Sequence, residues 1–179
     1  MSKATNKLDK ILGKLSKTVK ESIDRVTMLK LGEFTTSLIV KRTRLGYGVT
    51  KDLGNKEKLA KLKSTYIVAR ERFDGLSSMT TPRKSNLTRS GQMLDSMKSK
   101  YVKAGTILIT PTGSRDDGLT NAKVAEYNAT RVTYSNGYTK PARVFNRVSA
   151  AEFNQLLRFY RKTFGDLVKK SFKGSLIRK

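Results

Sequence analysis

The residue types that carry most enzyme chemistry are scarce in this sequence. It has no Cys and no His, so thiol chemistry, Cys-ligated zinc and the commonest general base are all excluded. The one pair of adjacent carboxylates is Asp116-Asp117, in the Gly-flanked loop at 114–118. Two-metal nucleases need several convergent carboxylates, whereas neighbouring carboxylates in a loop are usually solvated turn residues. We therefore expect no catalytic residue, no metal and no cofactor, and a protein that is not an enzyme.

Glycine-rich nucleotide motifs are also absent. Gly46-Tyr47-Gly48 is not followed by the remaining glycine of a dinucleotide fingerprint, and the chain contains no GxxxxGK[ST] loop and no G-x-S-x-G nucleophile elbow. These absences leave binding and assembly as the functions to consider.

Positive charge dominates the composition. Lys and Arg number 38 against 14 Asp and Glu, a net charge of +24, which predicts attraction to a polyanion or to acidic protein surfaces. Because Tyr66 is the one aromatic residue near the densest basic segment, contact with backbone phosphate is favoured over base stacking. A lysine face that is merely solvated is the alternative. The residues that could face DNA or an acidic partner are Lys56, Lys58, Lys61, Lys63, Arg83 and Lys84.

The first residues, MSKATNKLDK, contain no apolar segment of the secretory type, and nowhere do about 18 apolar residues run together. We therefore expect a protein made inside the cell, with no transmembrane helix and no membrane partner.

Helical patterns occupy both ends of the chain. Apolar residues at steps of three and four from residue 8 to residue 29 predict a long amphipathic helix, and the pattern resumes to about residue 45. The last helix, Ser149 to Lys173, is the clearest, and Ser149 with Glu152 begins it as a capping box. A shorter helix is predicted within 49–73 from the spacing of Leu59, Leu62, Tyr66, Val68 and Phe73.

Strand and turn signals lie between these helices. Thr88 resembles the N-cap of a short helix that starts near Ser90, and the β-branched run 106–110 predicts a strand that Pro111 stops. Residues 123–132 are ambiguous between helix and strand, whereas Asn136-Gly137 predicts a hairpin turn. Residues 143–148 read as a short strand or as an extended entry into the last helix.

These elements predict an α+β fold with a long N-terminal helix, a small mostly antiparallel sheet and a C-terminal helix packed on the sheet. We expect a single domain over 1–179, made of an N-terminal helical region (1–46), a basic helical arm and loop (47–86), and a core of sheet and C-terminal helix (87–179). The predicted core residues are Ile107, Ile109, Val124, Val144 and Phe145 on the sheet, with Phe153, Leu157, Tyr160 and Phe164 on the helix.

Residues 85–173 resemble the neck proteins of tailed bacteriophages, the head–tail connector and tail-completion family. Asn86 to Met97 is similar to the "TG-x-L-x-x-S-hydrophobic" helix entry of that family, with Ser90-Gly91 in place of Thr-Gly. Val124 to Thr130 is similar to its "hydrophobic-Ala-x-Tyr/Phe-E-x-G-T" segment but lacks the glycine, having Asn128-Ala129 instead. The residues that carry the resemblance are Leu87, Ser90, Gly91, Leu94, Glu126, Tyr127 and Pro141.

The resemblance implies a structural virion protein. It implies a homo-oligomeric ring subunit at the head–tail junction, in contact with the portal or adaptor, with tail proteins and non-specifically with the backbone of DNA in the channel. It also implies manufacture in the host cytoplasm and location in the virion neck. The positive charge alone motivates an alternative, a stand-alone basic nucleic-acid-binding accessory protein, and a nuclease that uses Asp116 and Asp117 is the third hypothesis.

Overall fold

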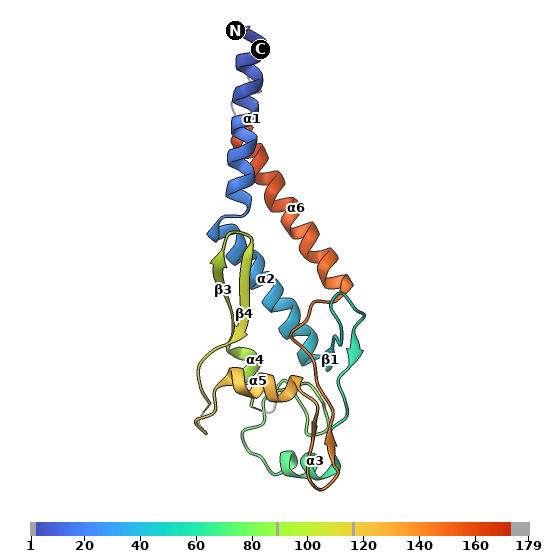
Figure 1. The fold of residues 1–179 in the computed structure, drawn as a ribbon. Coiled ribbons are helices and arrows are strands. Elements are labelled where there is room, and N and C mark those ends of the chain that lie inside the picture. The colour runs from blue at the N-terminus through green and yellow to red at the C-terminus, as the bar shows by residue number, and fades with distance from the viewer. Residues whose placement is uncertain (1–2, 89, 116, 173–179) are drawn as a thin grey trace.

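The computed structural model describes residues 3–88, 90–115 and 117–172. Six helices and three two-stranded antiparallel sheets alternate along this part of the chain, which confirms the predicted α+β class (Figure 1). The elements are α1 (Lys3–Ser22), α2 (Arg25–Arg44), β1 (Tyr47–Gly48), β2 (Glu57–Lys58), α3 (Ser64–Glu71), α4 (Gln92–Asp95), β3 (Met97–Lys103), β4 (Thr106–Pro111), α5 (Asn121–Ala129), β5 (Val132–Thr133), β6 (Thr139–Lys140) and α6 (Ala150–Phe172).

The predicted long N-terminal helix is two helices with a break at Ile23-Asp24. Asp24 has an extended backbone, and its Oδ1 accepts a hydrogen bond from the Thr27 backbone N–H at 2.7 Å, so this side chain caps α2. The apolar spacing runs through the break, which is why periodicity alone predicts one helix.

Helix α2 lies at the centre of the upper part of the molecule, between the β3–β4 hairpin and α6 (Figure 1). Gly32 permits close approach of the hairpin, because a Cβ there would lie 2.6 Å from the Cβ of Ser99. On α6, the ring of Phe159 stacks on that of Phe34 at 4.8 Å between centroids. Helix α2 therefore lies between the C-terminal helix and the hairpin and contacts both.

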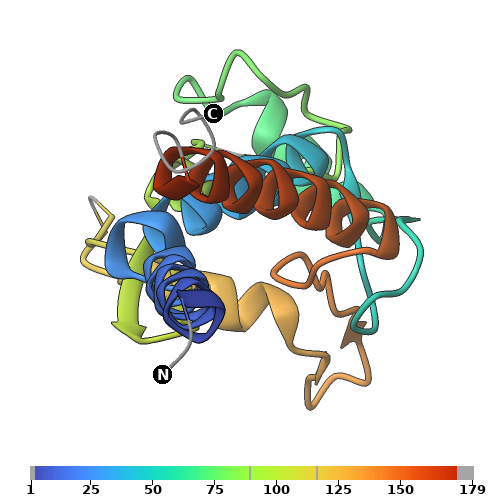
Figure 2. The ribbon, with the colours of Figure 1, turned by 90° about the horizontal axis from the view of Figure 1, so that it is seen from above.

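The C-terminal part of α6 lies beside α1, and the two extend away from the rest of the molecule, whereas the first part of α6 lies beside α2 (Figure 1). Figure 2 shows the same helices from above. The contact of α1 with α6 includes the hydroxyls of Ser22 and Tyr160, 3.0 Å apart. We call this helix pair the arm. Its first helix keeps small buried residues, Thr18 and Ser22, against α6.

The hydrophobic core lies where α2, α4 and the segment after β6 meet. Its buried members are Ile39, Met93, Leu94, Met97 and Phe145. Of the predicted core residues, Phe145 is buried, and Ile109 and Val124 pack on the cluster. The prediction is wrong for Phe153, which is 41% exposed, because α6 packs on α1 and α2 rather than over this cluster.

The predicted helix within 49–73 is wrong in its first half. Residues 47–58 form the short β1–β2 hairpin, and the helix spans only Ser64–Glu71. Gly48 explains the difference, because a Cβ there would lie 2.2 Å from the carbonyl oxygen of Val144. The backbone is therefore packed against residues far along the chain, and Leu59 is buried as part of this packing.

The middle of the chain confirms most of the turn signals. The 106–110 strand is β4, and the Asn136-Gly137 turn joins β5 to β6 with Gly137 at φ 76°. The ambiguous segment 123–132 is helical up to Ala129, the end of α5, and its last residue, Val132, begins β5. Thr88 is not the predicted N-cap, since α4 begins after Gly91. Residues 143–148 do not form a strand, and Asn146 and Arg147 lie in a bend. The capping box is confirmed, because the Glu152 carboxylate accepts from the backbone N–H and hydroxyl of Ser149, both at 2.8 Å.

Candidate binding pocket

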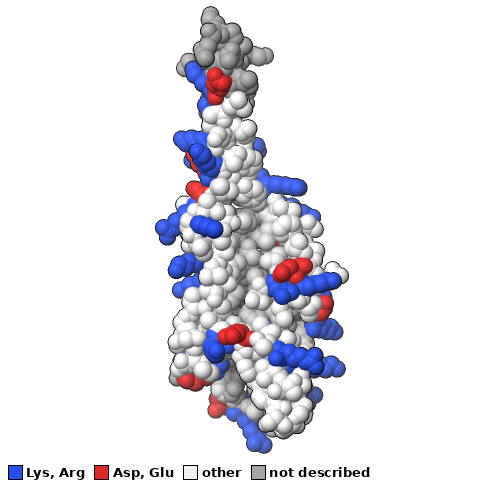
Figure 3. Space-filling view, in the orientation of Figure 1, with Lys and Arg blue, Asp and Glu red and all other residues white. Residues whose placement is uncertain are grey.

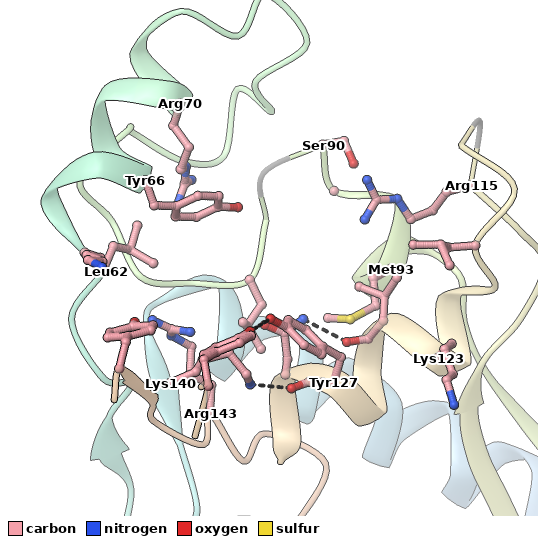
Figure 4. Close-up of a pocket in the computed structure, with 18 residues that line it drawn as sticks. Leu62, Tyr66, Arg70, Ser90, Met93, Arg115, Lys123, Tyr127, Lys140 and Arg143 are labelled. Carbon is pink, nitrogen blue, oxygen red and sulfur yellow. Dashed lines mark hydrogen bonds between the residues drawn. The ribbon is translucent and has the colours of Figure 1, made fainter. Parts of the chain in front are cut away.

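A pocket of about 580 Å³ opens at the end of the molecule opposite the arm (Figures 1 and 4). Its walls come from α3, the turn before α4, the loop after β4, α5 and the β5–β6 hairpin. Six cations and four tyrosines line it, over an apolar floor. The cations are Lys63, Arg70, Arg115, Lys123, Lys140 and Arg143, the tyrosines are Tyr66, Tyr127, Tyr134 and Tyr138, and the floor is Leu62, Leu87, Met93, Leu119 and Val124.

Three of the cations, Arg70, Lys140 and Arg143, are more than nine-tenths buried and are held by oxygens of the protein. Arg70 donates to the carbonyl of Lys84 at 3.0 Å, and Lys140 Nζ donates to the carbonyls of Tyr127 and Thr130, the latter at 2.7 Å. These bonds fix long side chains that would otherwise be mobile, so the positive charges have defined positions.

Arg143 connects distant parts of the pocket wall. Its Nε donates to the carbonyl of Ala60 at 3.2 Å, and its Nη2 donates to the carbonyl of Lys61 at 3.1 Å. Among the hydrogen bonds of the described residues, none uses Nη1 of Arg143, and Lys140 uses two of its three ammonium protons. Both side chains therefore retain donors for an incoming acceptor.

The pocket has a large excess of positive charge. Arg115 pairs with Asp117 at 2.9 Å, and Lys123 pairs with Glu126 at 3.6 Å. Lys63, Lys140 and Arg143 make no ion pair within 4.0 Å with an Asp or Glu of the described ranges. Burial lowers the pKa of Lys140 below its usual value, with a further contribution from the nearby Arg143 charge. Burial likewise lowers the pKa of Arg143. The ammonium and guanidinium groups are thus held where a negative charge would stabilise them.

The tyrosine rings are already engaged by neighbours within the pocket. Lys63 Nζ lies 4.1 Å from the Tyr138 ring centroid, and Lys140 Nζ lies 4.3 Å from that of Tyr127. The rings of Tyr134 and Tyr138 stack on each other at 5.9 Å. The hydroxyls of Tyr127 and Tyr134 share a hydrogen bond, the main cause of a raised pKa at Tyr127 (Figure 4).

Several residues of the bacteriophage resemblance meet at this pocket. Leu87, Ser90 and Gly91 line it from the turn before α4, and Tyr127 lines it from α5, although α4, β3 and β4 lie between these two segments in the sequence. Leu87 and Gly91 adopt positive φ values of 55° and 85°, which shape the turn into α4. Leu94 is a core residue instead. Of the remaining two, Glu126 is exposed on α5, and Pro141 is half-buried just after β6.

The lysines and arginine proposed to face DNA are not brought together. Lys63 lines the pocket, whereas Lys56 and Lys58 are exposed on the β1–β2 hairpin and Arg83 is exposed in a loop. The other two, Lys61 and Lys84, contribute backbone carbonyls to Arg143 and Arg70. On the face shown in Figure 3, Lys and Arg lie along both margins, and uncharged residues occupy much of the middle.

Lys140, Arg143, Tyr134 and Tyr138 are pocket residues that the sequence did not single out. Of this part of the sequence only Pro141 belongs to the resemblance, and Lys140 and Arg143 give no signal of their own, because buried cations and exposed ones look alike in sequence. The tyrosines were a weak signal, two of them flanking the Asn-Gly turn.

The adjacent carboxylates of the sequence are not part of a metal-ligating cluster in the described ranges. Asp116 lies outside them, Asp117 pairs with Arg115, and no group of three or more Asp or Glu there could hold a metal ion. The helices described are too short in apolar length to cross a membrane. Comparisons with protein-family models, curated proteins and solved structures found no match to this chain.

Proposed function

We propose that this chain is a structural subunit of a ring at the head–tail junction of a tailed bacteriophage, a neck or tail-completion protein without catalytic activity. The observation that carries the proposal is an uncovered apolar stripe on the arm. Ile11, Leu12, Leu15 and Val19 of α1 are 43%, 53%, 41% and 46% exposed although α6 lies beside this helix. An apolar stripe of this kind typically marks a surface for another protein.

A second exposed apolar patch gives the stripe a partner surface on the next subunit. Val102 and Leu108 of the β3–β4 hairpin are 55% and 50% exposed. Contact between two different patches of identical chains is heterologous, and it closes into a ring when the rotation between neighbours divides a full turn. Burying each aliphatic side chain would contribute up to about 1.5–3 kcal/mol. The resemblance of residues 85–173 to neck proteins supports the ring over an open filament.

The net positive charge of the chain also supports a position at the head–tail junction. A net +24 on each subunit of a ring is self-repelling unless an anion neutralises it. DNA in the channel, contacted non-specifically through its backbone, and acidic surfaces of the adjoining portal, adaptor and tail proteins would supply that negative charge. Exposed side chains such as Lys56, Lys58 and Arg83 are available for these contacts.

The test is assembly of the purified chain, alone and with its neighbouring connector protein, measured by light scattering after gel filtration and by electron microscopy. We expect rings, and we expect the double substitution Leu12→Gln and Val19→Gln to abolish them. The matched control is Lys10→Gln with Lys17→Gln, which alters exposed polar positions of the same helix and should leave rings intact. A wild-type chain that stays monomeric even with the connector present would refute the proposal.

A stand-alone nucleic-acid-binding protein is the second candidate, favoured by the charge and by the exposed lysines of the β1–β2 hairpin. It requires tight duplex binding by the isolated chain that falls about 10³- to 10⁵-fold between roughly 50 and 200 mM salt. Weak binding with a shallow salt dependence would exclude it.

A further inference from the structure

The cation-lined pocket lies at the opposite end from the arm, away from the surfaces proposed to close the ring, and it is too small to admit a double helix (Figure 1). We infer that it is the docking site for a segment of another protein that combines carboxylates with apolar side chains. The inference stands on the pocket geometry and does not depend on the proposed ring.

Charge complementarity identifies the negative component of the ligand. Lys140 and Arg143 are buried, make no ion pair with any described Asp or Glu, and each retains a donor that the protein does not use. Burial disfavours their charged forms, so a carboxylate placed between them would offset this desolvation cost. Exposed Lys63 and Lys123 at the rim would attract further carboxylates.

The apolar residues of the pocket indicate the apolar component of the ligand. Leu119 is 51% exposed at the pocket edge, and Met93, which belongs to the core, lies at its base. An aliphatic or aromatic side chain placed there would be removed from water, whereas a purely acidic chain would leave this surface uncovered.

The contacts that the tyrosine rings already make favour a peptide over a single-stranded nucleic acid as the ligand. Sequence-tolerant binding of bases requires open aromatic faces on which they can stack. In this pocket Lys63 and Lys140 each cover a ring face, and Tyr134 and Tyr138 stack on each other. Opening these faces for bases would break contacts that the protein already makes.

The ligand must come from a different protein. The acidic residues of this chain never occur more than two in succession, and a second copy would add another net +24 to the complex. A neighbour with an acidic and apolar terminal segment meets both requirements.

The experiment measures binding by fluorescence anisotropy at about 150 mM salt, where charges further apart than about 8 Å are screened. The probe is a labelled peptide of about eight residues, roughly 26 Å when extended, in which pairs of carboxylates alternate with single leucines. Two further probes have the same net charge. One is the peptide with serine in place of leucine, and the other is single-stranded oligothymidylate.

The pocket variant is Lys63→Glu with Lys123→Glu, two exposed positions whose replacement leaves the core untouched, and Leu119→Ser separately removes apolar surface. The matched control is Lys103→Glu with Lys162→Glu, an equal charge change on β3 and α6, away from the pocket. We expect saturable binding of the leucine peptide, weakened about tenfold by the pocket variant and less than about twofold by the control. Leu119→Ser should weaken the leucine peptide but not the serine peptide.

Equal losses in the pocket and control variants would show general electrostatic attraction and overturn the inference. Tighter binding of oligothymidylate that the pocket variant abolishes would make this a nucleic-acid site, and absence of saturable peptide binding up to about 1 mM would also refute it. A chain that binds the peptide but forms no ring would overturn the proposed function alone.

Discussion

Replacing Arg42 with alanine tests how the two ends of the chain are joined. Arg42 of α2 is 3% exposed, and its Nη1 lies 2.5 Å from the Glu152 carboxylate at the start of α6. The same guanidinium donates to the backbone carbonyls of Phe145 and of Arg147, the latter at 2.9 Å. One side chain therefore connects α2, the segment before α6, and the capping box itself.

The expected loss in the free energy of unfolding depends on the buried groups that remain after Arg42 is replaced. Glu152 is 1% exposed and its Oε1 already lacks a hydrogen-bond partner, so without Arg42 a buried carboxylate would retain only the donors of Ser149. Removing one partner of a buried ion pair typically costs about 3–5 kcal/mol, because the other charge remains desolvated and unpaired. Against a total stability of about 5–15 kcal/mol for a domain, this is a large loss.

The assay is urea denaturation at 25 °C followed by circular dichroism, and the control is Lys41→Ala, an exposed position on the same helix. We expect Arg42→Ala to lower the free energy of unfolding by about 3–5 kcal/mol and Lys41→Ala by less than about 0.5 kcal/mol. The double variant Arg42→Met with Glu152→Gln should recover part of the loss, because it removes both charges. Equal stability of the Arg42 and Lys41 variants would refute the reasoning.

Three smaller changes test other contacts. Gly32→Ala should destabilise by about 1–3 kcal/mol because its Cβ meets Ser99 across the α2–hairpin contact, whereas Gly13→Ala, which meets nothing within 4 Å, should stabilise by up to about 1 kcal/mol in the same urea assay. Leu94→Ala should cost about 2–5 kcal/mol, and a loss below 1 kcal/mol would show that this residue is not core. The folded state holds the Tyr127 proton more tightly than the unfolded chain, so this group's contribution to stability falls as pH rises above about 10. Tyr134→Phe should lower the Tyr127 pKa toward its ordinary value in a ¹³C NMR titration, and an unchanged pKa would contradict the hydrogen bond as its cause.

Elements with strong local signals could be predicted from the sequence. The last helix, its Ser149–Glu152 capping box, the β4 strand and the Asn136-Gly137 turn depend on residues close together in the chain. Each signal therefore sits within the window that a propensity or spacing argument examines.

Elements determined by distant contacts could not be predicted in this way. Strand β3 has lysine at three of its seven positions, and it is a strand because residues 97–103 pair with β4 and lie against α2. The helical spacing begins at Leu59, but the helix begins only at Ser64, after a chain segment whose Gly48 packs against Val144. In both cases tertiary packing overrides the local pattern, which is the usual limit of propensity arguments.

The pocket was beyond prediction for the same reason, and its wall shows how it is held in shape. The backbone N–H of Arg143 donates to the Asn128 carbonyl at 2.8 Å, and that of Val49 donates to the Val144 carbonyl at 3.1 Å. Phe145, two residues after Arg143, is buried in the core, and its carbonyl accepts a hydrogen bond from Arg42.

The segment that carries Lys140 and Arg143 is thus fixed by contacts with α5, with Val49 after β1, with the core and with Arg42 of the Arg42–Glu152 pair. A site whose charged groups are already immobilised loses little further entropy when a ligand binds. The position of this segment could not be predicted from the sequence because it depends on contacts with distant residues. The same contacts preorganise its cations for specific binding, in contrast to exposed lysines such as Lys56 and Lys58.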